Sequence, residues 1–234
     1  LGCVLPLACT KPVFGLCSSA RLVYPDAPMT PEKRPIIRGT KVYMRTIEHA
    51  DAALYSTWRS DAAPMTMAGF EYRGPLGTAG AEQLIGKILE TQGKPDWRFV
   101  VCLLENDRAL GEVFLFHVDH ENRSAEFGIF IGDPADWGKG FGSDALNAVC
   151  DFGFGRLDLA RIELVTRADN AIGRRSYEKA GFRLEGTRRS AFYSEGRRVD
   201  QLLMGLLKEE WEQLPRQKSW ELETGTPDAS AAAG

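Results

Sequence analysis

A glycine-rich turn at residues 137–143, with the sequence Trp-Gly-Lys-Gly-Phe-Gly-Ser, constrains the fold of this chain more than any other feature. An apolar, β-branched and aromatic segment at residues 126–132 precedes it, and a helical pattern follows from Asp144. The order is therefore strand, short loop, glycine turn and helix. Glycines remove the Cβ atoms that hold a ligand away, and the first turn of a helix offers unpaired N–H groups at the positive end of its dipole. This order predicts a backbone cradle for a diphosphate.

Two common phosphate-binding motifs do not fit the turn. A dinucleotide-binding fingerprint needs Gly-x-Gly-x-x-Gly, and Gly142 comes one position too early for its third glycine. A P-loop needs Gly-x-x-x-x-Gly-Lys-Ser/Thr, but the interval from Gly132 to Gly138 is one residue too long. Gly140 also stands where the magnesium-binding hydroxyl is required. Nucleotide triphosphate chemistry is therefore disfavoured.

The pattern that remains is Gln/Arg-x-x-Gly-x-Gly/Ala, with Trp137 in the first place and Gly140 and Gly142 in the others. In this the chain resembles the GNAT superfamily of acyl-CoA-dependent N-acetyltransferases. It resembles in particular the RimJ/RimL-like branch, where Trp-Gly-Lys-Gly is followed by a small or hydroxyl residue and an acidic one. Trp137 departs from the family's Arg or Gln, which removes one possible phosphate contact but leaves the backbone cradle intact.

A second segment, residues 170–182, carries the same resemblance. Asn170 is a good N-cap and Gly181 a good C′ residue for a helix between them. The resemblance assigns Asn170 to the pantetheine arm of coenzyme A and Tyr177 to the neighbourhood of its sulfur. Together the two segments extend the likeness over most of residues 36–207.

The resemblance implies an α/β (α+β) GNAT fold. We expect a mixed, mostly antiparallel sheet of about seven strands with flanking helices and a central splayed parallel pair. The expected strands are residues 36–45, 97–104, 110–117, 125–131, 161–166, 182–193 and 199–206. One helix is expected to end at residue 58. Three more are expected, at residues 79–91, directly after the cradle, and at residues 171–180. Residues 61–76 are expected to be irregular.

We expect one folded domain, residues 36–214, between two poorly ordered ends. Prolines recur through residues 1–35 without a sustained hydrophobic period, which predicts a loosely ordered extension. Residues 215–234 end in a run of small and polar side chains, which predicts a disordered tail.

Composition excludes several classes of protein. The net charge of −3 gives no reason to expect a nucleic acid partner, and no apolar run approaches the length of about 18 residues that would indicate a membrane span. The 5 cysteines form no Cys-x-x-Cys pair and the 3 histidines lack metal-ligand spacing, so we expect no metal. We expect a cytoplasmic protein, because the apolar head at residues 1–10 lacks a basic n-region and is interrupted by Pro6.

Acetyl transfer to an amine needs a base for the amine proton and help for the leaving thiolate. Glu126 begins the central strand, where the resembled family often has its base or water-holding carboxylate. Strand alternation puts it on one face with Gly128 and Phe130, although a strand-start glutamate can also be structurally neutral. Tyr177 is the proposed general acid. Cys102 and Cys150 are expected to be buried and unreactive, so we expect direct attack in a ternary complex and no acyl-enzyme.

The co-substrate implied by the resemblance is acetyl-CoA. The expected ligands are the backbone of Phe130 and Ile131 for pantetheine, the cradle residues Trp137, Gly138, Lys139, Gly140, Phe141, Gly142 and Ser143 for the diphosphate, and Asn170 for the pantetheine arm. Lys139 either adds charge to the cradle or is solvated. Asp144 is expected to point away from the phosphate, because a first-turn carboxylate interacts favourably with the helix dipole.

The favoured function is therefore an acetyl-CoA-dependent N-acetyltransferase. Its acceptor is an amine-bearing small molecule or a protein N-terminus, and polyamines, aminoglycosides and amino acids stay open. The alternative is a catalytically silent acyl-CoA-binding module on the same fold, because a fold does not fix a function. Many relatives pair, so a homodimer is also possible.

Overall fold

The computed structural model describes residues 37–69, 74–194 and 196–224 of the chain. Within them the strands form a single 8-stranded sheet in the order β1-β2-β3-β4-β5-β6-β8-β7. The expected fold is confirmed with one more strand than predicted. The predicted first strand is split into β1 (Ile37–Arg38) and β2 (Val42–Thr46), which pair antiparallel. The bend expected at Gly39 is a full reversal, closed by a 2.8 Å hydrogen bond from the Gly39 N–H to the Val42 carbonyl.

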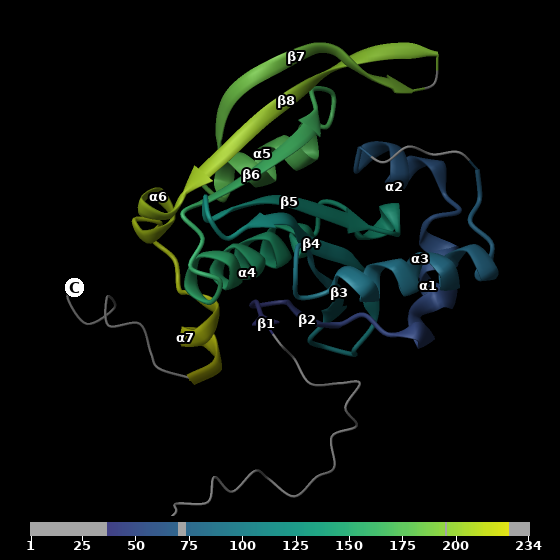
Figure 1. Cartoon of the computed structure of the whole chain (residues 1–234), viewed down its shortest axis with the longest axis horizontal. Helices are drawn as coiled ribbons and strands as arrows, with labels where there is room; N and C mark the ends of the chain where they lie inside the picture. Colours follow the sequence, from purple (N-terminus) through teal and green to yellow (C-terminus); the bar gives the residue numbers. More distant parts are fainter. Residues whose placement is uncertain (1–36, 70–73, 195, 225–234) are drawn as a thin grey trace, which may run out of the picture.

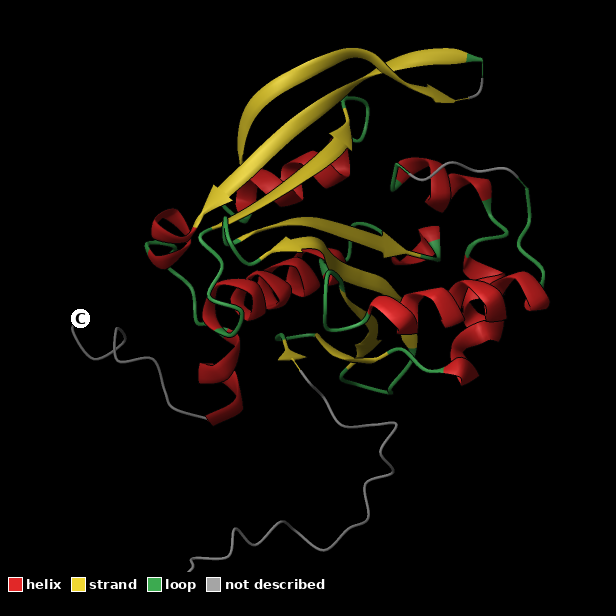
Figure 2. Cartoon of the chain, in the orientation of Figure 1, coloured by secondary structure: helices red, strands yellow, loops and turns green. Residues whose placement is uncertain are grey.

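The remaining elements follow the predicted order (Figures 1 and 2). The other strands are β3 (Trp97–Leu103), β4 (Ala109–Asp119), β5 (Ser124–Ile131), β6 (Arg161–Arg167), β7 (Arg183–Ser194) and β8 (Arg197–Leu207). The helices are η2 (His49–Asp51), α1 (Ala52–Trp58), α2 (Ala62–Met67), α3 (Thr78–Thr91), η3 (Pro134–Asp136), α4 (Phe141–Gly155), α5 (Ala171–Lys179), α6 (Lys208–Glu212) and α7 (Ser219–Thr224). None of the helices in the described residues is long and apolar enough to cross a bilayer.

The central parallel pair separates after a short stretch, as expected. The only parallel pairing between the described strands β5 and β6 ends at Glu126 and Glu163. Both strands continue, to Ile131 and Arg167 respectively. Beyond Glu126 the backbone of β5 therefore has no sheet partner on the β6 side, which leaves donors and acceptors for a ligand.

Two hydrophobic cores cover the two faces of the sheet. The first contains Phe127 together with residues of α4 such as Leu146. The second contains Phe130 together with residues of α1 and α3, among them Tyr55 and Ile85. Successive residues of a strand point to opposite faces, so α4 covers one face of β5 and the pair α1 and α3 covers the other.

Two short helices differ from the sequence expectation. Residues 61–76 were expected to be irregular, but α2 forms there because the Asp61 carboxylate accepts the Ala63 N–H and caps its first turn. Within the predicted disordered tail, α7 packs against α4: Asp151, 1% exposed in α4, accepts hydrogen bonds from the Ser219 N–H and from Arg216. Residues 1–35, 70–73 and 225–234, for which irregular or poorly ordered chain was predicted, lie outside the described residues.

Candidate active site

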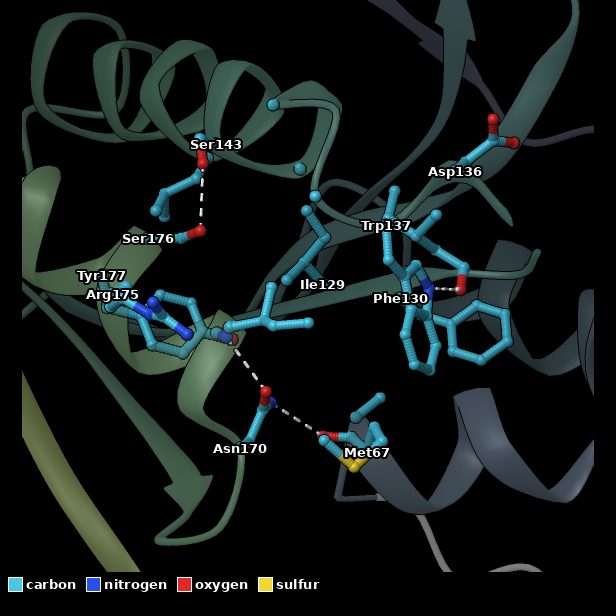
Figure 3. Close-up of a pocket in the computed structure, with 18 of the residues that line it drawn as sticks. Met67, Ile129, Phe130, Asp136, Trp137, Ser143, Asn170, Arg175, Ser176 and Tyr177 are labelled. Carbon is cyan, nitrogen blue, oxygen red and sulfur yellow. Dashed lines mark hydrogen bonds between the residues drawn. The ribbon is translucent and has the colours of Figure 1, made fainter. Parts of the chain in front are cut away.

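A cavity of about 500 Å³ lies beside the glycine-rich turn (Figure 3). Its walls come from the end of β5, the turn, the first turn of α4, one face of α5 and the end of α2. Among the predicted site residues, Phe130, Ile131, Trp137, Gly138, Gly140, Gly142, Ser143, Asn170 and Tyr177 line it, whereas Glu126, Lys139 and Phe141 do not. The structure thus brings the cradle and the helix after Asn170 to one cavity, although they are separate in the sequence.

The turn presents free backbone N–H groups. The first hydrogen bond of α4 runs from the Asp144 N–H to the Gly140 carbonyl at 3.0 Å. Within the described part of the chain, no acceptor is assigned to the N–H groups of residues 138–143. Gly138 and Gly140 have φ values of 75° and 86°, in the left-handed region that favours glycine. The turn, at the positive end of a 15-residue helix, therefore has the geometry that can bind an anion.

The Asp144 carboxylate points away from this cradle, as predicted. It accepts the backbone N–H groups of Thr40, Lys41 and Val42 at 3.0, 2.7 and 3.0 Å, and the Thr40 hydroxyl at 2.8 Å. These contacts fasten the β1–β2 turn to the start of α4. They also explain Gly39, since a Cβ atom there would lie 2.3 Å from an Asp144 oxygen.

Trp137 stands where the resembled family has Arg or Gln, and it acts through its indole. Its Nε1 donates to the Ile131 carbonyl at the end of β5 at 3.1 Å (Figure 3). The ring lines the cavity beside Phe130. Trp137 therefore supplies an apolar wall and fixes the strand end to the turn.

The ammonium of Lys139 is directed at Asp136 rather than into the cavity. Its Nζ lies 3.2 Å from Asp136 Oδ1, and Arg108 binds the same carboxylate with contacts of 2.7 and 2.9 Å. The hydrogen bonds from Arg108 are the largest effect and lower the pKa of Asp136; burial opposes them, and a hydrogen bond from Lys139 adds to the lowering, so this carboxylate stays ionised. Phe141 packs on the first core.

Asn170 joins two walls of the cavity. Its Oδ1 accepts the Gly173 N–H at 2.9 Å, which confirms the predicted N-cap, and its Nδ2 donates to the Met67 carbonyl of α2 at 3.1 Å. A second cross-link runs from the Ser143 hydroxyl to that of Ser176 at 3.0 Å (Figure 3). These two bonds hold α5 between α2 and the start of α4.

Tyr177 is 9% exposed and lies on the α4 side of β5, with its ring centroid 6.3 Å from that of Phe127. Burial raises the pKa of Tyr177 to about 12. The phenol is therefore protonated at neutral pH and faces the cavity as a hydrogen-bond donor.

Glu126 lies at the point where β5 and β6 separate. Strand alternation places it on the face opposite Phe127, next to Glu163 of β6. Its Oε2 is 3.6 Å from Nδ1 of His117. Burial raises the pKa of Glu126, an effect opposed by His117 and reinforced by the negative charge of Glu163.

Sequence reasoning missed two cationic residues. Arg175 and Lys179 lie one turn apart on α5 and both line the cavity. In the described residues neither is paired with a carboxylate; the Arg175 Nε donates to the Ala171 carbonyl. Arg175 and Lys179 are four residues apart, as are Ile172 and Ser176, and residues at this spacing lie on the same side of a helix. This spacing is the sequence pattern that could have identified the two cations.

The described part of the chain also holds two cysteines and side chains of the metal-binding types. Cys102 and Cys150 are buried, and burial raises the pKa of both thiols. Neither thiol is therefore an activated nucleophile. The described residues contain no cluster of His, Cys, Asp and Glu able to hold a metal ion.

Comparisons with known proteins agree with this geometry. A family model described as "Acetyltransferase (GNAT) domain" matches residues 41–183. The uncharacterized N-acetyltransferase p20 of Bacillus licheniformis is 34% identical over 114 residues, which cover 49% of this chain and 64% of p20, less than two thirds of its length. The putative ribosomal N-acetyltransferase YdaF of Bacillus subtilis is 32% identical over 50% of this chain and 68% of YdaF. The crystal structure of spermidine N-acetyltransferase from Vibrio cholerae in complex with CoA and spermine is similar with a TM-score of 0.66 and 27% identity, covering 74% of this chain and 98% of that one.

Proposed function

The chain belongs to the GNAT family of acetyltransferases, and we propose that it transfers an acetyl group from acetyl-CoA to a primary amine by direct attack in a ternary complex. The donor is acetyl-CoA, the co-substrate of this family, and a structural relative contains CoA. The observation that carries the proposal is the cavity itself. It combines the unpaired N–H groups of residues 138–143, the unpaired edge of β5 and the Tyr177 hydroxyl.

The cavity fits the separate parts of the donor. The amides of the cradle suit the diphosphate, because backbone N–H groups at a helix N-terminus bind phosphate without further charge. Arg175 and Lys179 add positive charge for a ligand that carries several phosphate charges. The edge of β5 beyond Glu126, which has no strand partner on the β6 side, suits the amides of pantetheine. The Trp137 indole uses one of the two lone pairs of the Ile131 carbonyl, and the other can still accept a pantetheine N–H.

Tyr177 acts in this proposal as a hydrogen-bond donor to the departing thiolate. An ordinary thiol has a pKa of about 8.5, so complete proton transfer from a phenol with a pKa of about 12 would be unfavourable by roughly 5 kcal/mol. A hydrogen bond to the developing thiolate needs no such transfer and is strong in a buried site. This refines the general-acid role expected from the sequence.

Glu126 is the proposed base. The attacking amine must lose a proton, and a carboxylate whose pKa is raised by burial is a stronger base than an exposed one. Because Tyr177 and Glu126 lie on opposite faces of β5, the proposal places the donor on the α4 face and the amine on the other. The reacting groups then meet through the gap that opens beyond Glu126.

The acceptor is a primary amine, and its class is the next step of the proposal. YdaF is a putative ribosomal N-acetyltransferase and the Vibrio cholerae protein a spermidine N-acetyltransferase. We therefore propose membership of the RimJ/RimL-like branch, with a polyamine or a protein N-terminus as acceptor. A homodimer and a cytoplasmic location stay predictions.

Release of free thiol from acetyl-CoA tests the function. The panel contains spermidine, spermine, an aminoglycoside, free amino acids and peptides that begin with Ser, Ala or Thr. We expect turnover with at least one amine and its loss in Tyr177→Phe, with CoA affinity measured by calorimetry unchanged. CoA binding without turnover on any amine would instead support the silent acyl-CoA-binding module.

A further inference from the structure

Lys41 lies behind the cradle and holds one of its peptide groups. Its Nζ donates to the Lys139 carbonyl at 3.1 Å, across a sequence separation of 98 residues. We propose that Lys41 is a positioning residue for the donor site: its ammonium holds the peptide between Lys139 and Gly140 with the carbonyl outward and the N–H toward the diphosphate. This inference rests on the proposed donor site and names a residue outside the cavity lining.

The direction of this peptide follows from peptide geometry. The peptide group is planar and trans, so its C=O and N–H point in opposite directions. Gly140 lines the cavity, whereas Lys139 and Lys41 do not. An ammonium that binds the carbonyl on the outer side therefore leaves the Gly140 N–H on the cavity side.

The peptide needs such a restraint because its neighbours are permissive. Gly140 has a φ of 86°, and a glycine adopts positive and negative φ with similar ease. Reversal of the peptide would turn its carbonyl oxygen toward the diphosphate and replace an attraction with a repulsion. Lys41 opposes this reversal, since its ammonium would lose the one hydrogen bond that it forms within the described residues.

The backbone of Lys41 is itself fixed on both sides. Its N–H donates to Asp144 at 2.7 Å, and its carbonyl accepts the Leu104 N–H at 3.0 Å. Asp144 belongs to the first turn of α4, directly after the cradle. The hydrogen bonds from residues 40–42 to Asp144 therefore also position the Lys41 side chain beside the cradle.

Lys41, like Arg175 and Lys179, is a cation near the turn that no carboxylate pairs with in the described residues. Within the described chain it forms no ion pair, while Lys139 and Arg108 share Asp136. An ammonium on a carbonyl polarises the peptide and strengthens its N–H as a donor. Gly140 leaves room for this approach, because a Cβ atom there would lie 3.3 Å from the Lys41 Nζ.

The test compares the variants Lys41→Met and Lys41→Arg with the control variant Arg38→Met. Arg38 is the exposed last residue of β1, so its replacement removes one positive charge beside the same β1–β2 turn. CoA affinity is measured by calorimetry without an acceptor, and KM for acetyl-CoA and kcat are measured with the best amine. We expect Lys41→Met to weaken CoA binding and raise KM by about tenfold, the equivalent of one charge-assisted hydrogen bond. The kcat at saturating donor should stay within about twofold, Lys41→Arg should recover most of the affinity, and Arg38→Met should resemble the parent protein.

Amide NMR supplies a signature that a general loss of stability would not produce. In the parent protein, CoA should shift the Gly140 amide proton strongly downfield, and in Lys41→Met this shift should be much smaller while that of Ser143 persists. Equal CoA affinity in Lys41→Met and the parent protein, or an equal loss in Arg38→Met, would overturn the proposal. Failure of every amine to react would refute the proposed function but leave this binding test intact; failure of the parent protein to bind CoA would refute both.

Discussion

Substitution of Tyr177 by Phe isolates the hydroxyl that the proposed mechanism places at the leaving thiolate. The ring packs against Phe127 and Phe182, and Phe retains these contacts. No hydrogen bond of the hydroxyl is present in the described structure, so its removal leaves no buried partner unsatisfied. We therefore expect the melting temperature and the CoA affinity of Tyr177→Phe to be close to those of the parent protein.

The catalytic cost follows from the interaction that is lost. A hydrogen bond to a charged group contributes about 1.5–3 kcal/mol, which corresponds to a decrease in kcat of about 10- to 150-fold. Thiol release under saturating acetyl-CoA and amine measures it. A kcat within about twofold of the parent value would refute the role of Tyr177, as would a loss that appears only in the KM for acetyl-CoA.

The pH profile separates a hydrogen-bond donor from a proton donor of ordinary acidity. Because burial raises the pKa of Tyr177 to about 12, the phenol keeps its proton as the pH rises to about 10. The parent kcat should show no basic limb from this group below that pH. A basic limb near pH 10, absent in Tyr177→Phe, would mean that the phenol titrates normally and that the assigned role is wrong.

Three further predictions follow from other parts of the site. Glu126→Gln should lower kcat/KM on the order of 100-fold. The base works only when deprotonated and burial raises the pKa of Glu126, so the parent enzyme should lose activity below a pH that lies above the ordinary carboxyl pKa, and the variant should lack this acid limb. An unchanged pH–rate profile would exclude Glu126 as the base. Gly39→Ala should lower the melting temperature and weaken CoA binding together, because its Cβ would displace Asp144 from the β1–β2 turn, and calorimetry on the folded variant checks whether the two effects occur together. Asp151→Ala should reduce the free energy of unfolding by about 3–5 kcal/mol, since it leaves Arg216 without its buried carboxylate; a urea midpoint like that of the parent would contradict this reasoning.

Local sequence signals were sufficient where a single segment determines its own structure. Helix α5 was predictable because Asn170 caps it and Gly181, with a φ of 96°, ends it. The cradle was predictable for the same reason, since Gly138 and Gly140 adopt the left-handed conformations that their identity permits. The alternation of β5, which puts Glu126 and Phe127 on opposite faces, also follows from sequence period alone.

Contacts between distant segments were not predictable in this way. Asp144 accepts hydrogen bonds from residues 40–42, and Lys41 donates to the Lys139 carbonyl. These bonds join positions about a hundred residues apart, and no local sequence pattern specifies such pairs. The pairing of Lys139 with Asp136 depends on how η3 folds back beside the turn. Helix α2 was missed because its 6 residues are too few to show a helical period.

A crystal structure of the protein with bound CoA would show where the diphosphate and the sulfur lie. We expect diphosphate oxygens at about 3 Å from backbone nitrogens of residues 138–143, and a sulfur within hydrogen-bond reach of the Tyr177 hydroxyl. A diphosphate bound elsewhere, for instance in the separate hollow between Thr57 and Arg108, would contradict it.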